Sequence, residues 1–405
     1  MVKKHIILFF LVIIVVSCTP LKRLKTVTQG NVEAKNYYEE IPFTYYNGEI
    51  IIEVEISSVK YHFVFDTGAD LTQIDDDLRN QIEHKSNKVS NTITDANNTK
   101  QKSEYIAIEN IKIGTINFSN TGAFVSDLSH FDEMFGCLEF DGIIGSNLMR
   151  KSNWQIDYDQ KVLRFTDEIS KLSTNEVVFA FKTHSGKYGP SKINLEINGQ
   201  KEKFTFDTGY SGSFTSNLSF FKLLNSNEKL ASTSYNYSNF SAYGKTVVKA
   251  NSAYIPKLQI DDLKLHNKLI NFKENGSNLI GNAFFQNYLV TLDWKNERVY
   301  LAPRHEMEDE VLKSFEVLFA PDYTDNSIRI NSTWDDHQLK EKIEIGSKIS
   351  TINSINVANF NKQELCEYWN TEKKTIFNND TIEIEVIQNG RAEKIVLTKK
   401  QLLPK

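Results

Sequence analysis

An internal repeat is the feature that most constrains this chain, because a duplicated motif requires two parts of the fold to be built alike. Residues 63–68 read Phe-Val-Phe-Asp-Thr-Gly, and residues 204–209 read Phe-Thr-Phe-Asp-Thr-Gly. An apolar-apolar-Gly segment follows each copy; its glycine lies 79 positions after the first aspartate and 74 after the second. Two motifs in the same order at near-equal spacing predict two similar lobes in one chain.

The lobes are predicted to be mainly β. Residues 50–56 and 192–197 are apolar or alternate at strand length. Asn198-Gly199 then gives a hairpin signal before the second repeat. Short helices are expected only around residues 148–149 and 284–285. The net charge of −5 over 405 residues gives no reason to expect a nucleic-acid partner.

The repeated aspartates, Asp66 and Asp207, are the candidate catalytic residues. Two carboxyls a few ångströms apart cannot both ionise easily, so they share one proton. The ionised member can take a proton from water while the protonated member donates to a developing oxyanion. This chemistry needs no cofactor or metal, and the eight histidines show no metal-ligand spacing.

The remaining repeat residues are predicted to support these loops. Glycine permits a sharp turn and a close approach, and the threonine hydroxyls can cross-link the loops through the opposite backbone. The apolar-Gly segments can pass close beneath each loop. The supporting residues are Thr67, Gly68, Thr208 and Gly209 in the loops, and Ile144, Gly145, Ile280 and Gly281 beneath them.

These motifs resemble those of the aspartic peptidases of the pepsin and retropepsin group, over roughly residues 41–303. The resemblance implies two tandem retropepsin-like β-barrel lobes forming a pepsin-like bilobal unit, with a cleft for an extended polypeptide and a β-hairpin flap. Residues 94–99 have the turn chemistry of a flap tip. Tyr210 replaces the small residue usual after Asp-Thr-Gly. The predicted function is endopeptidase, acting as a monomer; the alternative is a non-catalytic peptide-binding lipoprotein.

The N-terminus reads as a targeting segment. Lys3 and Lys4 precede an apolar run over residues 6–16, which is too short for a bilayer-spanning helix and suits a signal peptide. A small residue before Cys18 resembles a bacterial lipobox, which implies cleavage there and lipid attachment to the thiol. An ordinary signal peptide is the alternative. We therefore expect a protein of the bacterial cell envelope, lipid-anchored and facing the periplasm from the outer membrane.

The C-terminal region resembles a PDZ domain in residues 345–355, followed by a predicted helix over 361–369 and a hairpin over 381–397. If so, an extended peptide could add between strand and helix; a module that only packs on the lobes is the alternative. The predicted divisions are a signal peptide at 1–18, a tether at 19–40, lobes at 41–170 and 171–305, and the PDZ-like domain at 310–405.

Two further cysteines, Cys137 and Cys366, fall in segments assigned to different domains. We therefore predict no disulfide between them, and expect each to be a small buried apolar residue.

Overall fold

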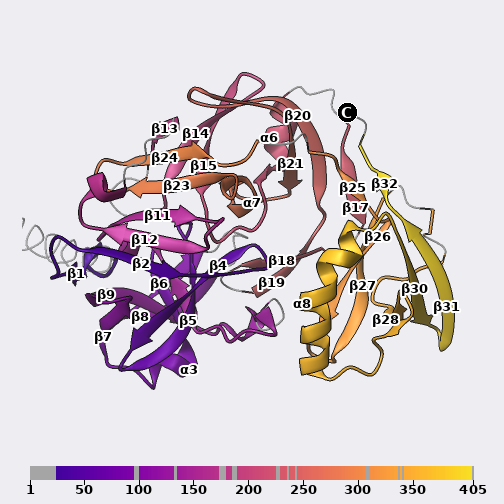
Figure 1. The fold of residues 1–405 in the computed structure, drawn as a ribbon, viewed down its shortest axis with the longest axis horizontal. Coiled ribbons are helices and arrows are strands. Elements are labelled where there is room, and N and C mark those ends of the chain that lie inside the picture. The colour runs from indigo at the N-terminus through magenta and orange to yellow at the C-terminus, as the bar shows by residue number, and fades with distance from the viewer. Residues whose placement is uncertain are drawn as a thin grey trace, which may run out of the picture.

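The chain is mainly β, in a computed structural model (Figure 1). The structure describes residues 24–94, 100–131, 135–172, 179–184, 189–224, 229–234, 237–241, 244–306, 310–335, 338–339 and 342–403. The signal segment, Cys18 and residues 95–99 of the predicted flap tip lie outside these ranges. Within them, no helix is long and apolar enough to cross a membrane.

The first Asp-Thr-Gly motif lies in a nine-stranded sheet with the order β1-β9-β6-β10-β5-β4-β8-β7, and β3 pairs with β4. Short helices α3 (Asp76–Arg79) and α5 (Ser146–Met149) adjoin it, with the 3-10 turn η1 (Ser129–Phe131). The strands are β1 (Asn31–Val32), β3 (Thr44–Tyr46), β4 (Glu49–Ile56), β5 (Val59–Phe65), β6 (Thr72–Asp75), β7 (His84–Thr94), β8 (Lys100–Ile113), β9 (Ile116–Ser126) and β10 (Gly142–Ile144).

The second motif lies in a sheet of the same plan. Strand β22 pairs in parallel with β15 and antiparallel with β16, just as β10 pairs with β5 and β6. Helices α6 (Leu218–Leu223) and α7 (Asn282–Phe285) correspond to α3 and α5. The strands are β14 (Lys192–Ile197), β15 (Gln200–Phe206), β16 (Phe214–Asn217), β17 (Ala231–Ser234), β20 (Asn251–Ile260), β21 (Leu263–Lys273) and β22 (Leu279–Ile280), with a separate hairpin of β18 (Tyr237–Ser241) and β19 (Gly244–Val248).

A six-stranded sheet joins the lobes, in the order β13-β24-β23-β11-β12-β2. Each lobe's repeat contributes strands to it, and the central antiparallel pair sets Ile156 opposite Val290. The strands are β2 (Tyr38–Pro42), β11 (Asn153–Asp157), β12 (Val162–Thr166), β13 (Phe179–Lys182), β23 (Tyr288–Asp293) and β24 (Arg298–Pro303), with the 3-10 turn η2 (Ile169–Leu172) after β12.

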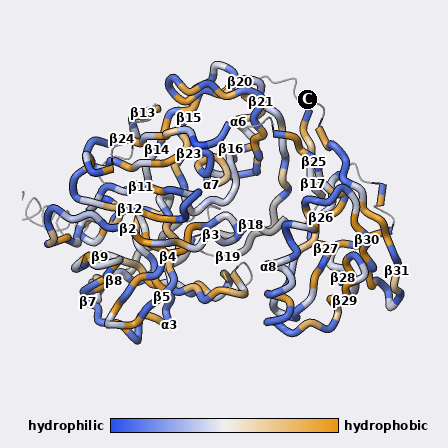
Figure 2. The backbone as a smooth tube through the Cα atoms, viewed as in Figure 1, coloured by the Kyte–Doolittle hydropathy of each residue, from blue (hydrophilic) through white to orange (hydrophobic). Residues whose placement is uncertain are grey.

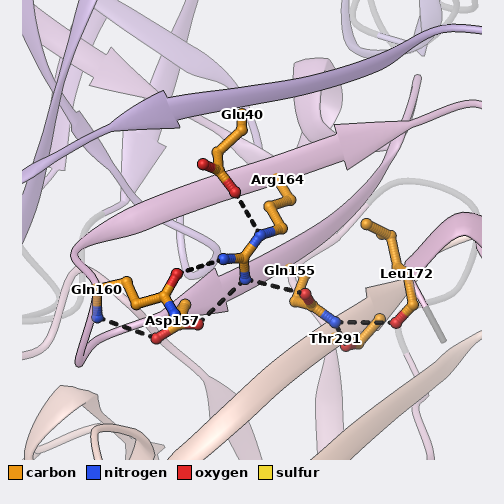
Figure 3. Close-up of polar contacts among 7 residues, drawn as sticks. All are labelled: Glu40, Gln155, Asp157, Gln160, Arg164, Leu172 and Thr291. Carbon is orange, nitrogen blue, oxygen red and sulfur yellow. Dashed lines mark hydrogen bonds and ion pairs between the residues drawn. The ribbon is translucent and has the colours of Figure 1, made fainter. Parts of the chain in front are cut away.

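Polar side chains also connect the strands of this sheet (Figure 3). Arg164 donates to Glu40 at 2.6 Å and to Asp157 at 3.1 Å, so one guanidinium links three neighbouring strands. Gln155 Nε2 donates to Thr291 Oγ1 across the lobe boundary at 3.1 Å. Arg164, Asp157 and Gln155 are largely buried, so these contacts supply the partners that buried polar groups need.

The C-terminal region has its own apolar core, formed by residues between Phe315 and Leu397. Its helix α8 (Lys362–Asn378) begins with a capping box between Asn361 and Glu364 and packs on the sheet (Figure 1). The strands are β25 (Lys313–Ser314), β26 (Val317–Asp322), β27 (Ser327–Trp334), β28 (Lys348–Ile352), β29 (Ile355–Asn356), β30 (Thr381–Gln388), β31 (Arg391–Thr398) and β32 (Lys400–Gln401). Exposed and more buried residues alternate along β14 and β30, as half-buried strands require, and Figure 2 shows the hydropathy along the chain.

The structure confirms the predicted strands, the two short helices and the C-terminal helix and hairpin. Asn198 and Gly199 have φ values of 46° and 84°, the left-handed pair of a two-residue hairpin turn. The helix extends well beyond the predicted 361–369, because Trp369 and Ile376 continue its buried face.

The prediction about the cysteines was wrong. Cys137 and Cys366 form a disulfide with Cα atoms 5.4 Å apart. The two segments lie far apart in sequence, but α8 packs against the first lobe, where Lys373 Nζ donates to Asn47 at 3.1 Å. Separate hydrophobic cores do not prevent contact between the surfaces of two domains.

Candidate active site

Two equivalent strand pairs place the Asp-Thr-Gly loops. Asp66 N–H donates to the carbonyl of Ile144 at 3.0 Å, and Asp207 N–H donates to that of Ile280 at 2.9 Å. Each aspartate therefore begins its loop where β5 or β15 leaves its parallel partner, β10 or β22. The loop bases are buried, because Phe65 and Phe206 are fully enclosed.

The threonines cross-link the two loops reciprocally. Thr67 Oγ1 donates to the carbonyl of Phe206 at 2.8 Å, and Thr208 Oγ1 donates to that of Phe65 at 2.7 Å. Each hydroxyl also accepts from the other threonine's backbone N–H at 3.0 Å. Both side chains are fully buried, so these four bonds hold the loops in one relative position.

The cross-link brings the two carboxyls together. A Cβ added to Gly68 would collide with the carboxyl of Asp207, and one added to Gly209 would collide with that of Asp66. The carboxyls are also within hydrogen-bonding reach of each other. Both motifs thus require glycine, because only a residue without a side chain leaves room for the opposite carboxyl.

The two carboxyls have different surroundings. Asp66 Oδ1 accepts from Gly68 N–H at 2.7 Å and from Ala69 N–H at 3.0 Å, whereas Asp207 Oδ1 accepts from Gly209 N–H at 3.0 Å. Burial raises the pKa of Asp66, and these N–H groups work against the rise. Burial and the negative charge of Asp66 raise the pKa of Asp207 well above its usual range. These surroundings make Asp207 the carboxyl that holds a proton more readily.

The glycines beneath the loops are in close contact with backbone. A Cβ at Gly145 would lie 2.5 Å from the carbonyl carbon of Leu71, and one at Gly281 would collide with the carbonyl of Tyr210. The ring of Tyr210 packs against Gly212 and Gly281, with Lys273 Nζ 5.9 Å from its centre. This bulky residue is therefore accommodated over glycines of its own lobe.

Sequence reasoning missed three buried polar residues beside the dyad. Asn282 Nδ2 donates to the carbonyls of Gly48 and Thr208, both at 2.7 Å, and its Oδ1 accepts from Tyr158 at 2.7 Å. Glu49 lies in the same region and is 5% exposed. Asn282 follows Gly281 directly, so a comparison of the residues after each repeated glycine would have drawn attention to Asn282. Nothing in the sequence around Glu49 distinguishes it from other glutamates on strands.

Each lobe also contributes a β-hairpin that follows its Asp-Thr-Gly loop in sequence. Strands β7 and β8 pair up to Thr94 and Lys100, with the predicted flap tip between them outside the described residues. The second lobe contributes the hairpin of β18 and β19.

One group of side chains within the described ranges has metal-ligand proximity, namely Asp75, Asp76 and Asp77. Asp75 already caps α3 and accepts from Leu128 N–H at 2.9 Å, which accounts for its position. The group lies at the start of α3, outside the two Asp-Thr-Gly loops.

Comparison with known proteins agrees with this geometry for the first lobe. Residues 52–151 match the family model of the gag-polyprotein putative aspartyl protease, which spans Asp66 and the segment ending in Gly145. No curated protein matches the chain. The matched segment is thus similar to a retropepsin-like aspartyl protease, and this similarity suggests peptidase activity.

Proposed function

We propose that this protein is an aspartic endopeptidase in which Asp66 and Asp207 hydrolyse an extended polypeptide. The reciprocal cross-link between Thr67 and Thr208 carries the proposal, because it holds two buried carboxyls within reach of one proton. The match of residues 52–151 to an aspartyl protease family supports the same activity.

The surroundings of the carboxyls assign their roles. Asp66, favoured as the ionised member, takes a proton from a water molecule, and the water oxygen bonds to the peptide carbonyl carbon. Asp207 gives its proton to the carbonyl oxygen, forming a gem-diol. The amide nitrogen then takes the proton held by Asp66, the C–N bond breaks, and a diol proton returns to Asp207. The dyad ends with one proton, as it began.

Cleavage of a mixed peptide library by the purified protein tests this proposal. We expect turnover that pepstatin blocks, and a loss of about 1,000-fold or more in Asp66→Asn and in Asp207→Asn. Asp76→Asn, at an exposed position in the first turn of α3 and outside both loops, is the matched control and should leave turnover unchanged. Binding of peptides without turnover across acid to neutral pH would contradict hydrolysis and support the non-catalytic alternative.

The proposal includes a location. We place the protein in the bacterial cell envelope, anchored by acylated Cys18 in the outer membrane and facing the periplasm. The disulfide between Cys137 and Cys366 supports an oxidising compartment. Membrane fractions from cells expressing wild type and Cys18→Ser test the anchor: the variant should be soluble, and retention of both in the membrane contradicts it.

We propose further that the C-terminal PDZ-like domain receives an extended peptide along β26. That strand pairs with β27 on one side and carries no other strand pairing among the described residues. We also propose a monomer, since one chain supplies both aspartates. Sedimentation of the active protein checks the second point, and a dimer would contradict it.

A further inference from the structure

Glu49 is a buried acid that the proposed reaction does not use. It follows the two-residue turn of Asn47 and Gly48, whose φ values are 51° and 88°, and it pairs with Tyr46 across the β3–β4 hairpin. Only 5% of the residue is exposed, and its Oε2 has no hydrogen-bond partner among the described residues. A buried carboxyl oxygen without a partner is costly and calls for an explanation.

The turn that carries Glu49 is fixed to the second catalytic loop. Asn282 Nδ2 donates both to the carbonyl of Gly48 and to that of Thr208, at 2.7 Å each. A Cβ on Gly48 would collide with Ser211, four residues after Asp207. The fold therefore holds Glu49 beside the dyad through contacts that do not involve its own carboxyl.

The titratable groups that interact electrostatically with Glu49 are all acids or phenols among the described residues. They are Asp66 and Asp207 on the two loops, Tyr45 on β3, and Tyr158 in the turn after β11. The rings of Tyr45 and Tyr158 lie 5.6 Å apart, and Tyr158 donates to Asn282. Among the described residues, none of the groups acting on Glu49 is a cation. An ionised Glu49 would have no compensating charge, so burial and the dyad raise the pKa of Glu49 well above its usual range.

We propose that Glu49 is a positioning residue for the dyad. Its side chain is an undissociated carboxylic acid. When it releases its proton to solvent, its negative charge makes the dyad hold the shared proton more strongly. The proposal rests on the proposed function, because it concerns the protonation of the Asp66–Asp207 pair. A negative charge on Glu49 makes removal of the last dyad proton harder, since three carboxylates would then share one enclosed site. Glu49 thereby extends the active, singly protonated dyad to higher pH.

The pH profile of kcat/KM for peptide cleavage tests this role. In Glu49→Gln the alkaline limb should move down by about half a pH unit or more, with kcat lost there while KM is kept. On the acid side the rate should stay within about two-fold of wild type, because glutamine and glutamic acid are both neutral. Glu55→Gln is the matched control: Glu55 lies on the same strand and pairs with Lys112 at the surface. Superimposable profiles for wild type and Glu49→Gln overturn the proposal.

Infrared spectroscopy of the full chain labelled with ¹³C-glutamate gives a readout independent of activity. A protonated glutamic acid band should persist above the pH at which exposed glutamates ionise. It should vanish in Glu49→Asp, a conservative variant that keeps an acid but loses the label, and should remain in Glu55→Gln. A wild-type band that survives unchanged in Glu49→Asp, or no such band at all, overturns the proposal. Failure of wild type to cleave any peptide would instead contradict the proposed function.

Discussion

The two lobes share one hydrogen-bond framework but give their aspartates different surroundings. Asp66 and Asp207 leave equivalent strands and bond equivalent carbonyls, and Thr67 and Thr208 make reciprocal bonds. In the first loop, Ala69 N–H points at the carboxyl of Asp66. In the second, Tyr210 N–H donates instead to the main-chain carbonyl of Asp207 at 3.3 Å. Duplication supplies two matched loops, and the N–H groups that reach the two carboxyls are one way in which the loops differ.

The C-terminal module is attached to the two lobes in different ways. It is bonded covalently to the first lobe through Cys137 and Cys366. It joins the second lobe by antiparallel strand pairing, since Thr233 of β17 lies opposite Trp334 of β27 and Ser234 lies opposite Thr333. The module is therefore held to the first lobe by a disulfide and by side-chain contacts such as that of Lys373 with Asn47, and to the second lobe by a shared sheet.

The largest expected effect tests the symmetric part of this comparison. Thr67→Val and Thr208→Val should each lower the free energy of unfolding by about 3 kcal/mol, because each removes two buried hydrogen bonds and leaves backbone groups unpaired. Urea denaturation of both variants measures this. Thr215→Val is the control: Thr215 Oγ1 makes one bond, to Asn271 at 3.0 Å, and should cost about 1 kcal/mol. If the free energies of unfolding lost in Thr67→Val and in Thr208→Val differ by more than the loss in Thr215→Val, the cross-link is not symmetric.

An effect of similar size is expected at the attachment of the C-terminal module. Cys366→Ser should lower stability by about 2–4 kcal/mol, since the bond closes a loop with a sequence separation of 229 residues. Hydrogen exchange should speed up in α8, where Lys373 contacts Asn47, and should stay slow in β27, which remains paired with β17. Cys137→Ser should reproduce the result, and the double variant should add nothing. Faster exchange in β27 as well would show that the sheet connection depends on the disulfide.

The repeat was enough to predict the β fold and to single out both aspartates, because those features depend on local spacing. Once the loops are known to face each other, the hydrogen-bond partner of each threonine hydroxyl can be inferred: the carbonyl of Phe206 for Thr67, and the carbonyl of Phe65 for Thr208. Three features depended on distant parts of the chain: the disulfide, the bonds of Asn282 to Gly48 and Thr208, and the burial of Glu49. Their residues have ordinary neighbours in sequence, and only the docking of separate segments makes them special.

The smallest expected effect concerns the difference between the two acids. Because the folded-state pKa of Asp207 is raised, its contribution to stability is full below the unfolded pKa of about 3.9 and is lost as pH rises toward the folded value. Asp207→Asn should therefore be more stable than wild type at neutral pH, by about 1.4 kcal/mol for each unit by which folding raises the pKa of Asp207. Near pH 3 the two proteins should be equally stable. Asp66→Asn should gain less, because the carboxyl left behind, Asp207, has fewer N–H donors to support its charge. Unfolding free energies of the three proteins at both pH values measure the difference. An equal or larger gain in Asp66→Asn would reverse the assignment of base and acid.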